Sequence, residues 1–358
     1  MKKLDFYIIK KFLGTFFFIL MLLVLIAVVI DFSEKIDNFI QSSATFSQIL
    51  IEYYANFIPH IAALLAPLFI LVSVVFFTSQ LATRSEIIAM TSGGVSFYRL
   101  MVPYLISAAI LGGIQFYSNH YWIPNANKVR VVFEDEMLAK WKPSSKVGIH
   151  RKLDDSTYLY MSKYLLNDNR GLKATVETFE DGELKTKLAA AEMRWDTVQE
   201  NWLFTSYFSR EFEAEGEIFE RGDTIRLDLN IVPDDFQRKL SSKEMMTTPE
   251  LKSFITELKA TGQEYVEFYQ LELYRRTSSV GSIFILTIIG LAIASRKIRG
   301  GLGIHIMAAI VTGALFEMTM KFSTTFTTNA GFPPVLGVWT PNIIFGVVAL
   351  ILIRFAQK

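Results

Sequence analysis

Long uncharged segments separate the charged parts of this chain and predict membrane-spanning helices. The first, at 12–30, has 19 residues without a charged side chain, enough for an α-helix to cross a hydrocarbon core about 30 Å thick. It is longer than the apolar part of a signal peptide and no small-residue cleavage pattern follows it, so we expect a retained anchor. Five more spans are expected at 53–83, 100–127, 277–295, 300–321 and the second half of 322–353.

The segment 128–250 has a different pattern, with charges throughout and hydrophobic residues at alternate positions. Alternation combined with β-branched and aromatic residues predicts strands at 157–162, 173–179, 202–208 and 224–232. Turn-forming residues separate these strands at 167–171, 180–182 and 221–223. We therefore expect a compact antiparallel sandwich or jelly-roll.

Together these patterns predict an α+β membrane protein with six transmembrane helices, three on each side of an inserted antiparallel β-jelly-roll. The expected parts are transmembrane helices 1–3 at 1–127, the β-domain at 128–250 and transmembrane helices 4–6 at 251–358. An amphipathic helix that begins near Pro249 is expected to lead back to the membrane. Lysine and arginine accumulate near both termini and in the short connections at 84–99 and 296–299. We therefore expect both termini and these connections to be cytoplasmic and the β-domain periplasmic.

The composition and the polar residues exclude several classes of function. With 51% hydrophobic residues the chain is typical of an integral membrane protein, and its net charge of +1 gives no general attraction to nucleic acid. It has no cysteine, and its four histidines lack the spacing of a metal site. The sequence contains neither a Gly-x-Ser-x-Gly motif nor a Gly-x-x-x-x-Gly-Lys-Ser/Thr loop. We expect no metal, no cofactor and no enzymatic activity, so any ATP must be bound by another subunit.

The connector between the second and third spans combines charges, a brief hydrophobic run and two glycines. It reads Arg84-Ser-Glu-Ile-Ile-Ala-Met-Thr-Ser-Gly-Gly-Val-Ser96. In a short helix, Ser85 can cap the N-terminus, Glu86 suits its positive end, and the double glycine at 93–94 can end it. The hydrophobic residues then available for contact are Ile87, Ile88 and Met90. Two interpretations are open, an amphipathic turn on the membrane surface or a helix that docks on a cytoplasmic partner.

Cations near the outer ends of the spans predict a second functional region. Lys321 lies 21 residues after the start of the fifth span, roughly 30 Å along a helix, and Lys35, Arg275 and Arg276 are expected at the same level. Such a group suits an amphiphile with anionic head groups, because phosphate is well matched by lysine and arginine. The alternatives are ordinary contact with lipid phosphates and, for Lys321, an ion pair with Glu317 four residues before it.

Several short motifs, taken in order, resemble the lipopolysaccharide-export permeases of the LptF/LptG (YjgP/YjgQ) type over nearly the whole chain. They are Leu4-Asp-x-Tyr-Ile8, the Arg84-Ser-Glu-Ile connector with Met90 and Gly93, Ala189-Ala-Ala-Glu-x-x-Trp195, Met246-Thr-x-x-Glu-Leu251, Tyr269-x-x-Glu-Leu273 and Gly331-Phe-Pro-Pro334. The first and last motifs favour the LptG-like side of the family. The chain departs from it where Asp31 follows the first span without the lysine typical of LptG-like proteins, and where His305 replaces an arginine.

The resemblance implies a permease subunit of an ATP-binding-cassette transporter in the bacterial inner membrane. Family members pair with a second LptF/LptG-type permease on a cytoplasmic LptB-like ATPase dimer, with a single-span LptC-like protein nearby. They extract lipopolysaccharide from among the membrane lipids of the outer leaflet and pass it through the jelly-roll to a periplasmic bridge towards the outer membrane. The connector would hold the cytoplasmic coupling helix, at about 84–94, and the coupling residues would be Arg84, Glu86, Ile87, Ile88, Met90 and Gly93. The candidate substrate-binding residues are Lys35, Arg275, Arg276 and Lys321.

A non-transporting membrane scaffold or receptor, whose β-domain binds a partner, is the alternative from a different class. It fits the same layout of spans and β-domain. A permease should co-purify with a nucleotide-binding subunit, whereas a scaffold has no need of one.

Overall fold

The computed structural model describes residues 3–138, 145–154, 156–166, 168–213, 216–229, 231–233, 236, 243–260, 266–296 and 301–356. The chain divides into two compact units, which are described separately. The helical unit comprises Met1–Leu138, Lys243–Pro249 and Glu267–Lys358, and the sheet unit comprises Ala139–Ser242 and Glu250–Val266. Parts of several expectations lie outside the described residues, among them the turn residue Asn167, position 230 of the strand expected at 224–232, the charged segment 297–299 and the start of the fifth span at 300.

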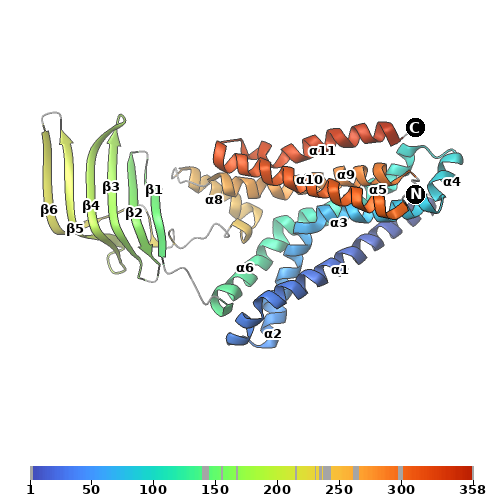
Figure 1. Cartoon of the computed structure of the whole chain (residues 1–358). Helices are drawn as coiled ribbons and strands as arrows, with labels where there is room; N and C mark the ends of the chain where they lie inside the picture. The colour runs from blue at the N-terminus through green and yellow to red at the C-terminus, as the bar shows by residue number, and fades with distance from the viewer. Residues whose placement is uncertain are drawn as a thin grey trace. The chain divides into compact units, whose positions relative to one another are not determined.

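In the described part of the helical unit, six helical segments are long and apolar enough to cross a membrane, as predicted (Figure 1). The first is α1 (Lys3–Gln41). The second contains α2 (Phe46–Gln48), a π-helical stretch (Ile49–Tyr54) and α3 (Ala55–Thr83), and the third contains α5 (Phe97–Tyr117), α6 (Ile123–Phe133) and π-helical stretches at Ser118–Trp122 and Glu134–Leu138. The last three are α9 (Val266–Ala294), α10 (Gly301–Ala330) and α11 (Pro334–Ala356).

Several helices continue well beyond the uncharged stretches that predicted them. Helix α1 has 39 residues, about twice the length of its uncharged stretch at 12–30. The third helical segment runs through position 128, where the β-domain was expected to begin, and the first strand starts at Ser145. An uncharged stretch marks the part of a helix that suits hydrocarbon, whereas polar residues outside it can continue the same helix.

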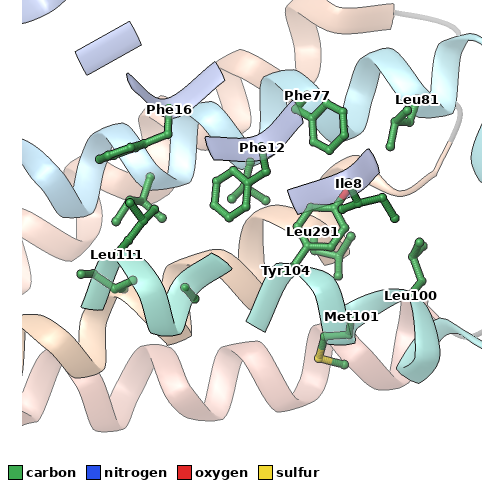
Figure 2. Close-up of a cluster of buried hydrophobic side chains, with 14 of the residues drawn as sticks. Ile8, Phe12, Phe16, Phe77, Leu81, Leu100, Met101, Tyr104, Leu111 and Leu291 are labelled. Carbon is green, nitrogen blue, oxygen red and sulfur yellow. The ribbon is translucent and has the colours of Figure 1, made fainter. Parts of the chain in front are cut away.

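The six segments differ strongly in how far they are buried within the helical unit. In the segments that contain α3, α5 and α9, 50–56% of the most apolar stretch is buried, against 11% in α1 and 22% in α10. A hydrophobic cluster that includes Ile8, Phe12 and Tyr104 joins α1 to the inner helices (Figure 2). A Cβ on Gly290 of α9 would lie 3.0 Å from Val74 of α3, so the glycine permits a close helix approach.

Six antiparallel strands form one sheet in chain order (Figure 1). They are β1 (Ser145–Lys152), β2 (Thr157–Leu165), β3 (Arg170–Glu180), β4 (Glu183–Asp196), β5 (Asn201–Glu213) and β6 (Gly216–Leu227). The inserted antiparallel β-domain is confirmed, and its described strands follow a plain meander without Greek-key crossings. Its core includes Met161, Met193 and Phe204. The buried Trp202 donates a hydrogen bond from Nε1 to the carbonyl of Ile231 at 2.9 Å.

One expected turn of the sheet is confirmed and another is wrong. Asp181 and Gly182 both have positive φ, 51° and 83°, as a two-residue hairpin between β3 and β4 requires. The turn expected at 221–223 instead lies inside β6, and the strand expected at 224–232 ends at Leu227. Gly222 pairs with Tyr207, and a Cβ on Gly222 would lie 2.6 Å from that ring. This glycine therefore makes room for an aromatic side chain rather than for a turn.

The amphipathic helix expected near Pro249 is α8 (Thr248–Ala260), with Pro249 in its first turn. Its buried hydrophobic residues are Leu251, Phe254, Ile255 and Leu258. Their spacing of three and four residues places them on one helical face.

Candidate functional site

The connector forms helix α4 (Glu86–Ser92). It lies where α1 begins and α11 ends, which we call the connector end of the helical unit, the opposite end being the far end (Figure 1). Ser85 precedes α4 with a φ of 59°, and its side chain makes no capping hydrogen bond, so the expected cap is wrong. The carbonyl of Ser85 instead accepts the first helical bond from the N–H of Ala89 at 2.9 Å. The left-handed backbone conformation of Ser85 interrupts the helix, so α4 is separate from α3.

The double glycine ends α4 as predicted. The N–H of Val95 donates to the carbonyl of Met90 at 3.1 Å, and the N–H of Gly94 donates to the carbonyl of Thr91 at 3.0 Å. This pair of bonds is a Schellman motif, which needs a left-handed residue directly after the helix. Gly94 supplies it with a φ of 85°, while Gly93 has a φ of −77°. The connector is therefore a fixed helix with a defined end.

The residues predicted to contact a partner lie on different faces of α4. Ile87 is 5% exposed and belongs to the same hydrophobic cluster as Ile8 and Leu100, and Met90 packs against that cluster. Ile88 is 49% exposed. Arg84 and Gly93 are also exposed, and Glu86 is half-buried. One face of α4 thus belongs to the core of this chain, and the other is available to a partner.

Two polar contacts join the first turns of α1 to its neighbours at the connector end. The Tyr7 hydroxyl donates to Glu86 Oε2 at 3.4 Å, and Arg99, in the first turn of α5, forms an ion pair with Asp5 at 2.7 Å. Asp5 is 3% exposed. Sequence reasoning missed this pair, because the partners are 94 positions apart. The available signal was Asp5 itself, a carboxylate beside a hydrophobic run, which needs a partner when it is buried.

At the far end, Lys35 lies among acidic and phenolic groups. Its ammonium group is 3.2 Å from Asp31 Oδ1 and 2.9 Å from Glu134 Oε1, and it also donates to the Tyr53 hydroxyl. Tyr53 and Tyr54 both donate to Asp31. Two carboxylates surround one ammonium group, so this cluster ties α1 to the second and third helical segments.

Arg275 and Arg276 of α9 share one carboxylate, Glu272. Arg275 Nη2 lies 2.8 Å from Glu272 Oε2, and Arg276 Nε lies 3.3 Å from Oε1. Arg276 is 2% exposed and also donates to the Thr248 hydroxyl at 3.0 Å and to the carbonyl of Met246 at 2.8 Å. It therefore holds the segment before α8 against α9. The Arg275 side chain remains 41% exposed.

Lys321 differs from the other three predicted cations. Its side chain is exposed, and among the described residues it has no carboxylate within 4.0 Å, so the ion pair with Glu317 that the spacing allows is not formed. Glu317 instead lines a cavity of about 110 Å³ together with Arg275, Asn119 and Ser279. Lys321 is thus the predicted cation with the greatest freedom to bind an anionic group.

Two buried histidines form hydrogen bonds with hydroxyl groups. His305 Nδ1 of α10 lies 2.7 Å from the Ser79 hydroxyl of α3. His120 Nδ1 lies 2.8 Å from the Thr248 hydroxyl. These bonds join helices that are far apart in the sequence.

The chain is similar to known proteins over almost its whole length. The family described as lipopolysaccharide export system permease LptF/LptG matches residues 6–354. The lipopolysaccharide export system permease protein LptG of Haemophilus influenzae (strain ATCC 51907 / DSM 11121 / KW20 / Rd) is 22% identical over 352 residues, which cover 96% of this chain and 95% of that protein. Both matches include the connector, the far-end cations and the sheet.

Proposed function

The chain belongs to the LptF/LptG family of lipopolysaccharide export permeases, and on this premise we propose that it is the permease subunit of an ATP-binding-cassette transporter. It is an inner-membrane transport protein and not itself an enzyme. In the proposal it extracts lipopolysaccharide from the outer leaflet and passes it to a periplasmic bridge, while a separate LptB-like ATPase dimer hydrolyses ATP. A second LptF/LptG-type permease and a single-span LptC-like protein complete the complex.

The two-sided connector helix is the main structural support for this proposal. Ile87 anchors α4 in the core of the helical unit, while Ile88 on α4 and Arg84, two residues before it, are exposed. A short fixed helix of this kind suits a groove on a soluble ATPase, with Ile88 as the apolar contact and Glu86 as the polar one. In this arrangement the connector end is cytoplasmic, and so are both termini.

Exposed hydrophobic surface on α1 and α10 supports a second permease and a lipid path. These two helices have the smallest buried share of the six spans. Large side chains that are at least half exposed include Phe18 and Leu25 on α1 and Phe322 and Phe326 on α10. In a membrane protein such surface faces lipid or another helix. We assign it to the paired permease and to the acyl chains of the substrate.

The far-end cations have different roles in the proposal. Lys321 is exposed and Arg275 is 41% exposed, so these two would bind phosphate groups of the substrate directly. Lys35 and Arg276 are held by several partners. They would contribute by fixing the helices that border the path.

The two edge strands of the sheet support a handover to a further β-protein. Among the described strands, β1 and β6 each pair with one neighbour. An open edge can accept a strand from another chain, because its backbone groups lack partners on one side. We assign this role to contact with the LptC-like protein and the periplasmic bridge.

The test is co-purification with an ATPase, followed by ATP-dependent release of fluorescent lipopolysaccharide from proteoliposomes. Glu86→Lys should lower the release rate about tenfold or more, because hydrogen bonds to charged groups contribute about 1.5–3 kcal/mol. Glu34→Lys, the same change at an exposed carboxylate of α1, is the control. If no ATPase co-purifies, or if both variants behave alike, the chain is better described as a scaffold.

A further inference from the structure

The first turns of α1 contact the elements on both sides of the connector's double glycine. We propose that Asp5 and Arg99 are positioning residues that fix α1 to the connector, so that movement of α4 is transmitted directly to α1. The inference rests on the proposed function, since it assumes that an ATPase moves α4. The connector joins α3 to α5 along the chain. In this inference α1 becomes a third helix that moves with the connector.

The ion pair between Asp5 and Arg99 is the central contact. Asp5 is 3% exposed and lies 2.7 Å from Arg99. Arg99 follows Ser96, whose hydroxyl accepts the Arg99 N–H at 3.2 Å and caps α5. A buried carboxylate held in this way does not readily exchange its partner for water.

Further contacts join α1 to α4 itself. Tyr7 donates its hydroxyl hydrogen to Glu86, the residue assigned to the ATPase contact. One position further along α1, Ile8 is fully buried in a hydrophobic cluster together with Leu100 of α5 (Figure 2). The same cluster includes Ile87 of α4. Polar and apolar contacts thus hold α1 to the two elements on either side of Gly93 and Gly94.

The rest of α1 provides a reason for such an attachment. Only 11% of its most apolar stretch is buried, so much of its length faces away from the helical unit. In the proposed function this is the surface that meets substrate and the second permease. Helix α1 is described as one continuous helix from Lys3 to Gln41, which carries a displacement of its first turns along its length.

The test measures ATP hydrolysed per lipopolysaccharide released in the reconstituted complex. Arg99→Gln, which removes the more exposed partner, should raise this ratio about fivefold, at the low end of energetic coupling between sites. Arg99→Lys keeps the charge and should restore most of the wild-type ratio. Lys10→Gln removes an exposed charge from the next turns of α1 and should leave the ratio unchanged. Asp5→Asn should behave like Arg99→Gln.

A purely structural role would lower the yield of complex without changing the ratio. Suppose that the wild-type complex releases lipopolysaccharide, but the Arg99→Gln and Lys10→Gln complexes give the same ratio. The inference is then wrong and the proposed function stands. If the wild-type complex itself releases none with ATP, the proposed function fails first. If Asp5→Asn cannot be purified, Arg99→Gln and Arg99→Lys still decide the outcome.

Discussion

The two ends of the helical unit use charged side chains in different ways. At the connector end, Asp5 and Arg99 form a close pair, and Arg84 is exposed. At the far end, Lys35 contacts two carboxylates and a tyrosine, and Arg276 contacts a carboxylate, a hydroxyl and two backbone carbonyls. The connector end thus leaves cationic surface for a partner, whereas the far end uses most of its cations internally.

The position of a cation along a span therefore does not reveal its role. Lys35, Arg276 and Lys321 were predicted at one level of the membrane, yet the first two are held by several groups and the third is exposed. A buried cation with several partners cannot bind a substrate without losing them, which costs free energy. Exposure and partners, rather than depth alone, separate structural cations from candidate binding groups.

The largest effect is expected at Arg276. Arg276→Ala removes the partner that Glu272 and the carbonyl of Met246 share. Breaking a buried pair typically costs about 3–5 kcal/mol, so denaturant unfolding in detergent should show a loss of that size. Arg275→Ala, at a side chain that is 41% exposed, should cost about 1 kcal/mol or less. Equal losses would remove the distinction between these two arginines.

A smaller effect should separate the two faces of the connector helix. Ile87→Ala removes a side chain that is 5% exposed and should lower the free energy of unfolding by about 2–4 kcal/mol. Ile88→Ala, at a side chain that is 49% exposed, should change it by about 0.5 kcal/mol or less but weaken retention of the ATPase on purification. If only Ile87→Ala lost the ATPase, the ATPase contact would depend on the buried face of α4 and not on the exposed one.

The smallest effect is expected at the exposed cation of the far end. Lys321→Glu should reduce photo-cross-linking of lipopolysaccharide to α10 about threefold to fivefold, because an exposed charge contact contributes up to about 1 kcal/mol. Lys321→Arg keeps the charge and is the matched control. The folded protein should be equally stable, since Lys321 has no ion pair among the described residues. Unchanged cross-linking in Lys321→Glu would leave the substrate contact to Arg275.

The sequence predicted the spans, the inserted sheet and the connector because each depends on local patterns. The uncharged stretches, the alternation of hydrophobic and polar residues and the double glycine can each be recognised from residues that are close together in the sequence. Helix ends were predicted less well, since α1 continues past its uncharged stretch at both ends. The prediction of a turn at 221–223 was wrong because Gly222 makes room for the ring of Tyr207 on the neighbouring strand.

The partners of the charged residues could not be predicted from local patterns. Asp5 and Arg99 are 94 positions apart, and Lys35 and Glu134 are 99 apart. Only the packing of helices brings such groups together. The spacing of Glu317 and Lys321 suggested a local pair, yet Glu317 faces a cavity lined by residues of other helices. Tertiary contacts therefore determine the partners of these charged residues.

The length of α1 has a mechanical consequence. Its 39 residues extend roughly 58 Å at 1.5 Å per residue, more than the full thickness of about 40–45 Å of a bilayer with its head groups. Because the uncharged stretch lies near the middle, both ends extend towards water. A tilt of about 10° around one end of such a rod moves the other end by roughly 10 Å. A small rotation of α1 about its first turns therefore displaces the opposite end of the helix by about the width of a helix.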